Sequence, residues 1–248
     1  MIVDGAAFTV WAADPEPRIT QLGQPEHRVR CASVLKPLYF WAASTLPAFR
    51  DDPDGWAQLA EPAVTVSSND PTVAIWQACG PDALLHAIAT LTGVQWHSDP
   101  SAERSFGRVL VRADEVARAY AALAVSAWSE DAAAGRLLGW MRAVPDRQTF
   151  GARTAAAQAL GVTPTEVGVK TGWYIDADET SLRTHAVTVT GTGRADDTAR
   201  GSAVLTAIPV SETVRAGYAT TYVRGEEVLP IHWDVAAETI SRTTASLL

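Results

Sequence analysis

The pattern of hydrophobic and polar residues predicts strands toward both ends of the chain and helices in the middle. Near the N-terminus, residues 6–13 and 26–32 are short β-prone stretches separated by a cluster of Asp, Pro and Gly, which predicts two strands with turns between them. Toward the C-terminus, β-branched and aromatic residues recur at 167–175, 184–191 and 202–210, with glycines between them. These stretches predict three further strands.

The middle of the chain begins with a long apolar segment. From Ser33, the sequence SVLKPLYFWAASTL predicts a helix that ends before Pro47. Residues 48–66 carry a cluster of Asp, Pro and Gly and predict a loop. The segments 71–79 and 81–92 each begin with Pro and are followed by Gly, the asymmetry that is typical of helix ends.

Alanine-rich segments follow. The stretches 113–125, 129–144 and 154–161 combine strong helix formers with helical spacing of apolar residues, so each predicts a helix. The polar stretch 94–108 before them predicts irregular structure, and the last residues, 235–248, suit a closing helix.

This order of elements predicts an α+β fold. Strands at both ends and a block of helices between them favour an antiparallel sheet built from both chain ends, with an inserted all-helical subdomain. The 248 residues fit one domain over 1–248, with its sheet part at about 1–32 and 165–248 and its helical part at about 33–164.

Composition and charge exclude several classes of function. The formal net charge of −8 argues against nucleic acid as a partner. No apolar run approaches the roughly 20 residues that span a bilayer, and no signal peptide is visible, so we expect a cytoplasmic protein unless a leader has been removed from an exported one. The two cysteines, Cys31 and Cys79, form no metal-binding or disulfide pattern. We expect neither a metal nor a cofactor.

Lysine is almost absent from the chain. Of the 20 basic residues only Lys36 and Lys170 are lysines, and the others are arginines. A buried ammonium can lose its proton and act as a base, whereas a guanidinium cannot. The pattern therefore indicates that these two lysines serve chemistry.

Lys36 follows Ser33 by three residues. If a helix begins near Ser33, the two side chains share one face, and the helix N-terminus offers N–H groups to a developing oxyanion. A neutral lysine could then take the serine proton. This Ser-x-x-Lys pattern is weak by itself. Cys31 is a second candidate nucleophile, ranked lower because no histidine lies near it.

Two other short segments carry candidate chemistry. In Ser67-Ser68-Asn69 a hydroxyl could pass on a proton and a carboxamide could hold a substrate amide, although Ser and Asn before a helix are usually caps. In Lys170-Thr171-Gly172 the glycine marks a close approach within a strand, although a lysine on an edge strand followed by a turn is also possible.

Together and in this order, the three segments resemble the motifs of the serine β-lactamase and penicillin-binding protein superfamily, in particular class A β-lactamases. The similarity covers about residues 28–248. It implies an acyl-enzyme mechanism in which Ser33 is the nucleophile, Lys36 its base and Ser67 a proton relay. Lys170 would complete the catalytic set.

The resemblance also implies how a substrate is held. Asn69 would hold the substrate amide, while Lys170 and Thr171 would face its carboxylate. Gly172 and Trp173 would line the site, and the backbone N–H groups of Ser33 and Trp173 would form the oxyanion hole.

Three features depart from the family pattern. Ser68 stands where the family usually has Asp, and Pro37 directly follows Lys36. Class A β-lactamases carry a glutamate and an asparagine on a longer loop in place of 94–108, where they position the deacylating water. Here Glu103 is the possible deacylation base, with a solvated loop carboxylate beside Arg104 as the alternative.

The sequence thus predicts a serine hydrolase that acts on a β-lactam or another small amide or ester, with that small molecule as its partner. One alternative is a D-alanyl-peptidase, transacylase or biosynthetic esterase or amidase of the same fold. Another is a pseudoenzyme that binds without turnover. Arg183 or His185 could also contact a substrate carboxylate, although an exposed strand arginine is the simpler interpretation.

Overall fold

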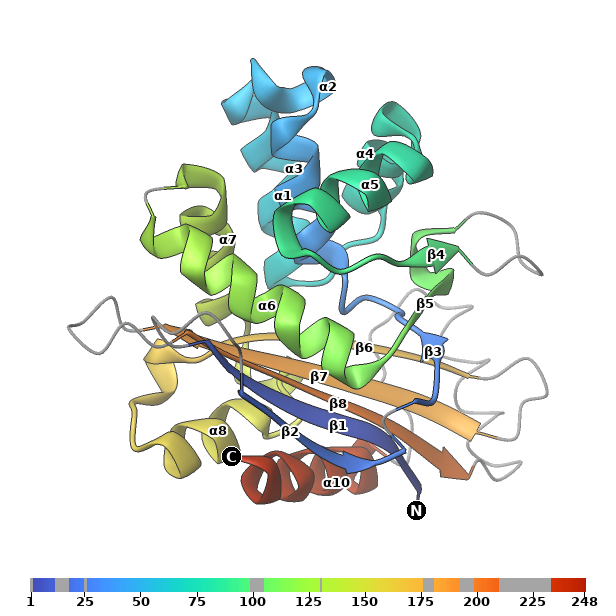
Figure 1. The fold of residues 1–248 in the computed structure, drawn as a ribbon, viewed down its shortest axis with the longest axis vertical. Coiled ribbons are helices and arrows are strands. Elements are labelled where there is room, and N and C mark those ends of the chain that lie inside the picture. Colours follow the sequence, from blue (N-terminus) through green and yellow to red (C-terminus); the bar gives the residue numbers. More distant parts are fainter. Residues whose placement is uncertain are drawn as a thin grey trace.

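Strands from both ends of the chain lie side by side in one five-stranded antiparallel sheet in the part of the chain that the computed structural model describes (Figure 1). The strand order is β2-β1-β8-β7-β6, so N-terminal β1 pairs with C-terminal β8 and the predicted α+β fold is confirmed. The strands are β1 (Ile2–Trp11), β2 (Arg18–Gly23), β6 (Gly168–Ile175), β7 (Ser181–Gly191) and β8 (Ala199–Pro209). The described residues are 2–11, 18–24, 26–98, 105–129, 131–175, 181–191, 199–209 and 233–248.

Helices cover both faces of this sheet (Figure 1). On one face, α6 (Ala113–Trp128) crosses β8, β1 and β7. The contact with β8 is close because Gly201 has no side chain; a Cβ there would lie 2.2 Å from the Ala117 backbone oxygen. On the other face lie α8 (Ala152–Leu160) and α10 (Trp233–Leu247), which pack on each other.

The remaining helices lie around the buried helix α1, mostly in a layer beyond α6, although α7 also packs against β6 of the large sheet. Because the first eight residues of α1 are buried, this helix is the centre of the main hydrophobic core. The helices of this layer are α1 (Lys36–Thr45), α2 (Pro47–Arg50), α3 (Pro53–Thr65), α4 (Asp70–Cys79), α5 (Pro81–Thr92) and α7 (Ala132–Arg142), and the short 3-10 turns are η1 (Phe106–Arg108), η2 (Asp146–Gln148) and η3 (Pro164–Glu166).

A small second sheet lies beside the start of α1. Its order is β3-β5-β4, with β3 (Val29–Arg30), β4 (His97–Ser98) and β5 (Val109–Val111). Two of these strands, β4 and β5, fall within the predicted helical part at about 33–164, in and directly after the stretch 94–108 that was predicted to be irregular. The small sheet matters because β3 runs directly into the turn that carries Ser33.

The loop predicted at 48–66 is wrong, because most of it forms α3. The Asp, Pro and Gly residues that suggested a loop start the helix instead: the Asp52 side chain accepts a hydrogen bond from the Gly55 N–H. Trp56, Ala60 and Val64 then recur at helical spacing and are buried.

The structure also differs from the prediction at two other elements. The interval between the first two predicted strands contains β2, which pairs along β1. The helix predicted from Ser33 begins at Lys36, after a turn over 32–35. No helix of the described residues is long and apolar enough to cross a bilayer.

Candidate active site

Ser33 lies in a tight turn between β3 and α1. The turn is closed by hydrogen bonds from Val34 N to Cys31 O (3.1 Å) and from Lys36 N to Ser33 O (3.3 Å). Ala32 has a φ of +49°, a left-handed conformation that residues other than glycine seldom adopt. The sharp turn leaves the Ser33 side chain half-buried and directs the chain into α1.

Neighbouring elements hold this turn from several sides. The backbone N–H groups of Cys31 and Ala32 donate to Val109 O (2.9 Å) and Gly107 O (3.1 Å). From α6, the buried Tyr120 hydroxyl donates a hydrogen bond to Val34 O. A position held by this many partners is costly to displace, so the structure preorganises the Ser33 backbone.

One face of β6 contacts the same region. Alternate residues of a strand point to the same side, and Lys170, Gly172 and Tyr174 form such a row. Lys170 Nζ donates to Ser67 Oγ, a Cβ added to Gly172 would lie 2.5 Å from Ser33 N, and the Tyr174 hydroxyl accepts from Arg30 N.

Both lysines meet at Ser67. Lys170 Nζ lies 2.8 Å from Ser67 Oγ, and Lys36 Nζ lies 2.5 Å from Ser67 O. Ser67 has a φ of +61°, which turns its carbonyl and its hydroxyl toward the two different amines. The structure therefore brings Lys36, Ser67 and Lys170 together, although 103 positions separate the last two in sequence.

Asn69 also contacts Lys36. Its Oδ1 accepts from Lys36 Nζ at 2.8 Å, and Ser68 O accepts at 2.9 Å. Asn69 is the first residue before α4, yet its side chain makes no capping hydrogen bond. The capping role that its position suggested is therefore replaced by a contact with the buried amine.

Burial controls the charge of both lysines. Loss of solvation lowers the pKa of Lys36 to about 7. Burial, and then the nearby charge of Lys36, hold the pKa of Lys170 well below its usual value. The three oxygens around Lys36 Nζ favour the ammonium, while burial favours the amine, so both forms are present near neutral pH.

Within the described part of the chain, Lys36 Nζ has no carboxylate partner. Its fourth neighbour is the Phe106 ring, whose centroid lies 5.4 Å away. No hydrogen bond joins Lys36 to the Ser33 hydroxyl among these residues, because the amine donates to Ser67, Ser68 and Asn69 instead. Glu103, the possible deacylation base, lies outside the described residues.

Cys31 is a poor nucleophile. Its side chain is buried, and its Sγ donates to Phe106 O at 3.3 Å. Burial raises the pKa of the thiol to about 12, so little thiolate exists near neutral pH. The ranking of Ser33 above Cys31 is consistent with this environment.

Thr171 and Trp173 lie on the opposite face of β6. The Thr171 hydroxyl donates to Gln148 O at 2.8 Å, and Trp173 packs beside the core cluster that includes Phe150 and Ile240. A hydroxyl has a single hydrogen to donate. Donation to a substrate carboxylate would therefore require Thr171 to release Gln148.

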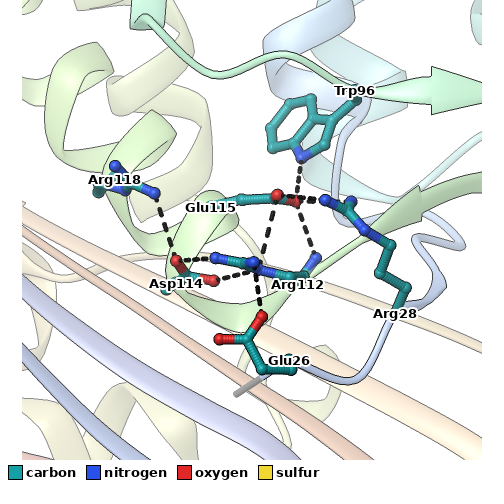
Figure 2. Close-up of polar contacts among 7 residues, drawn as sticks. All are labelled: Glu26, Arg28, Trp96, Arg112, Asp114, Glu115 and Arg118. Atoms are coloured by element: carbon teal, nitrogen blue, oxygen red, sulfur yellow. Dashed lines mark hydrogen bonds and ion pairs between the residues drawn. The ribbon is translucent and has the colours of Figure 1, made fainter.

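A polar network anchors the segments that lead to the site (Figure 2). Glu115, in the first turn of α6, accepts from Arg28 at 2.7 and 3.1 Å and from Trp96 Nε1 at 3.0 Å. It also accepts from the Arg112 backbone N–H at 3.1 Å. The network ties the residues before β3 to α6 and to the segment before β4. Its other members are Glu26, Asp114 and Arg118.

Sequence reasoning missed several residues that contact the site. They come from elements far apart in the chain and carry no local signal, since each acts through a contact made only in the folded state. His185 was considered for carboxylate binding, but it is fully buried and its Nε2 lies 3.0 Å from Arg30 O. The missed residues are Phe106, Tyr120, Gln148 and Tyr174.

Among the described residues, no group of three or more His, Cys, Asp or Glu side chains could hold a metal ion. The arrangement places Ser67 between two buried amines, with Lys170 on its hydroxyl and Lys36 on its carbonyl oxygen.

Comparisons with known proteins agree on the fold. No family model matches the chain, and no curated protein matches it in sequence. The solved structure of a β-lactamase from Streptosporangium roseum is similar, with a TM-score of 0.58 and 15% identity over 99% of this chain and 95% of that one. The chromosome-encoded β-lactamase of Vibrio parahaemolyticus gives a TM-score of 0.55 and 11% identity over 99% and 93%.

A mutant of the last common ancestor of Gram-negative class A β-lactamases is also similar, with a TM-score of 0.56 and 13% identity over 98% of this chain and 91% of that one. At such identities the likeness establishes the fold alone. The chain has the fold of class A β-lactamases, as the motifs predicted.

Proposed function

We propose that this protein is a serine acyl-enzyme catalyst that acts on a β-lactam or another small amide or ester, with Ser33 as its nucleophile. The observation that supports this most directly is the pair of buried amines on Ser67, beside the contact between Gly172 and Ser33. Strongly perturbed pKa values cluster at functional sites, and a lysine with a lowered pKa suits general-base catalysis.

In the proposed acylation step, the Lys36 amine takes the proton of the Ser33 hydroxyl. To do so, Lys36 must direct its lone pair to Ser33 Oγ and release one of its three oxygen contacts. Asn69 is the contact most easily exchanged, because its side chain is exposed and a substrate amide can take its place.

Ser33 Oγ then bonds to the substrate carbonyl carbon. The N–H groups of Ser33 and Trp173 stabilise the negative charge that develops on the carbonyl oxygen. The bond from that carbon to the leaving nitrogen or oxygen breaks. The leaving atom takes the proton of the Ser67 hydroxyl, and Ser67 Oγ in turn takes a replacement proton from Lys170, whose Nζ lies 2.8 Å away.

The acceptor that releases the acyl group is water or a small amine or alcohol. Transfer to an amine or alcohol is a second candidate function, since the contacts of Lys36 among the described residues are three amide-type oxygens and an aromatic ring, with no carboxylate to activate water.

The test is intact-protein mass spectrometry after exposure to benzylpenicillin, a cephalosporin and p-nitrophenyl acetate. The expected result is a single acyl adduct that maps to Ser33. Ser33→Ala should form none, while Ser246→Ala, which removes an exposed serine hydroxyl at the C-terminal helix, should react like the wild type. Absence of any adduct and of turnover with all three compounds would overturn the proposal.

A second measurement separates the alternatives. Adduct that disappears in buffer indicates a hydrolase, and adduct that persists until a small amine or alcohol is added indicates a transferase. A pseudoenzyme would bind benzylpenicillin without forming an adduct at any pH.

A further inference from the structure

Arg30, three residues before Ser33, has both of its backbone polar groups held by side chains of the large sheet. Its N–H donates to the Tyr174 hydroxyl at 3.2 Å, and its carbonyl oxygen lies 3.0 Å from His185 Nε2. Because a carbonyl can only accept, His185 carries its hydrogen on Nε2. Tyr174 and His185 also pack edge to face, with ring centroids 5.7 Å apart.

These two bonds take the place of a missing strand neighbour. Arg30 faces Leu110 of β5 on one side of β3, and the small sheet ends there. On the other side, Tyr174 of β6 and His185 of β7 form hydrogen bonds with the backbone N–H and carbonyl oxygen of Arg30. Arg30 is therefore a direct hydrogen-bonded link between the small sheet, which leads into the Ser33 turn, and the large sheet, which carries Lys170 and Gly172.

Tyr174, which holds Arg30, lies on the same face of β6 as the residues that contact the site. Lys170 contacts Ser67, Gly172 abuts Ser33, and Tyr174 is the next residue in the same row. His185 is the cross-strand partner of Gly172. The first two members of the row belong to the recognisable motif, but Tyr174 and His185 lie outside it.

The spacing between the two sheets sets the spacing of the proposed oxyanion hole. One of its N–H groups belongs to Ser33, on the turn after β3, and the other to Trp173, on β6. Trp173 directly precedes Tyr174, and only Cys31 and Ala32 separate Arg30 from Ser33. A bond between Tyr174 and Arg30 thus fixes the two donors relative to each other.

We propose that Tyr174 and His185 are positioning residues that lock Arg30, and through it the Ser33 turn, at the separation from β6 that an oxyanion requires. The inference rests on the proposed function, because it assigns these residues to the acylation step at Ser33. His185 acts here through Arg30. Its ring is fully buried and its Nε2 is already bonded, so it does not act as a carboxylate ligand.

The test compares Tyr174→Phe, His185→Leu and His185→Gln. Tyr174→Phe deletes only the hydroxyl, and His185→Leu deletes the donor to Arg30 O. His185→Gln places an amide N–H at the same number of bonds from Cβ as Nε2 and should rescue the loss. A matched control is Ser126→Ala, which removes a part-buried hydrogen bond to Asp131 at the start of α7.

The readout is the acylation burst with p-nitrophenyl acetate and with benzylpenicillin. In Tyr174→Phe and His185→Leu we expect the maximal acylation rate to fall about 10- to 100-fold, because small displacements of reacting groups have effects of this size. The half-saturating concentration should change by less than about threefold, since ground-state binding is retained. His185→Gln should recover most of the rate, and Ser126→Ala should not change it.

A second readout does not depend on catalysis. In a Cys79→Ser background, Cys31 is the remaining thiol of the chain, and it is buried next to Arg30. Loosening the link should speed labelling of Cys31 by N-ethylmaleimide about 10-fold, in the same variants that lose acylation rate.

The two readouts separate the two proposals. If the wild type forms no acyl adduct, the proposed function fails, and unchanged Cys31 labelling in both Tyr174→Phe and His185→Leu would then overturn the link as well. If the wild type is acylated, wild-type acylation rates in these two variants overturn the positioning role. Should His185→Leu not fold, Tyr174→Phe alone decides, because it preserves the ring and its packing.

Discussion

Gly172 in β6 and Ser33 in the turn before α1 meet backbone to backbone. A Cβ on Gly172 would lie 2.5 Å from Ser33 N and 3.0 Å from Val34 N. Backbone atoms cannot rotate away as a flexible side chain can. The strand that carries Lys170 and the turn that carries Ser33 are therefore closer together than a residue with a Cβ at position 172 would allow.

This contact predicts a strong effect of Gly172→Ala. The added methyl group must push the Ser33 turn away from β6, so the acylation rate should fall about 100-fold and the free energy of unfolding by roughly 1–3 kcal/mol. Burst kinetics and chemical denaturation measure the two effects.

Gly135→Ala in α7 is the matched control for Gly172→Ala. A Cβ at Gly135 meets nothing within 4 Å. An alanine in a helix interior should stabilise the protein by roughly 0.5–1 kcal/mol and leave acylation unchanged. A Gly172→Ala protein that acylates at the wild-type rate would contradict the close approach.

The pKa of Lys36 predicts how acylation depends on pH. Burial lowers this pKa to about 7, and only the amine form can accept the Ser33 proton. The acylation rate should therefore rise with pH, reach half its maximum near pH 7 and level off above. Lys36→Arg should abolish the rise, because arginine stays protonated throughout. A flat or falling wild-type profile between pH 6 and about 8 would exclude Lys36 as the base.

Stability should also depend on pH through Lys36. An unfolded lysine holds its proton up to about pH 10.4, while the folded chain releases it near pH 7. Between these values the unfolded state binds more protons, so the free energy of unfolding rises with pH. Relative to Lys36→Met, the wild type should gain roughly 1 kcal/mol per pH unit between about pH 7 and 8.5. Parallel urea-denaturation profiles of the two proteins would show that Lys36 keeps an ordinary pKa.

The bond from Thr171 to Gln148 predicts a structural effect of Thr171→Val. Valine keeps the shape but not the hydroxyl, so the free energy of unfolding should fall by roughly 1 kcal/mol. Benzylpenicillin carries a carboxylate and p-nitrophenyl acetate does not. The half-saturating concentrations of both should stay unchanged. A selective weakening for benzylpenicillin would instead support the carboxylate contact that the motif implies.

The network around Glu115 predicts a large loss of stability in Glu115→Ala. The change leaves Arg28 and the Trp96 indole without their acceptor, and removal of one partner from a part-buried ionic network costs roughly 2–4 kcal/mol. The control is Glu238→Ala, whose exposed pair with Arg242 on α10 should contribute less than about 0.5 kcal/mol. Equal losses in the two variants, measured by thermal denaturation, would mean that the network in Figure 2 adds no specific stability.

Much of the fold could be predicted from local patterns. The strands at both ends, the alanine-rich helices and the closing helix each follow from periodicity and turn residues that lie within the same segment. The region 48–66 failed because Asp52, Pro53 and Gly55 favour a loop and a helix start equally well. The helix forms because Trp56 and its neighbours are buried against α1 and α7, a contact that exists only in the folded chain.

The sequence by itself determined which residues could carry chemistry. Every basic residue other than Lys36 and Lys170 is an arginine, and both lysines lie in motifs whose order can be read from the sequence. Tertiary structure decided the rest: that both amines meet at Ser67, that Gly172 touches Ser33, and that Tyr174 and His185 hold Arg30. The physical reason is that proton affinity and reactivity depend on burial and on partners within a few ångströms, and the folded chain supplies those partners from segments that are far apart in sequence.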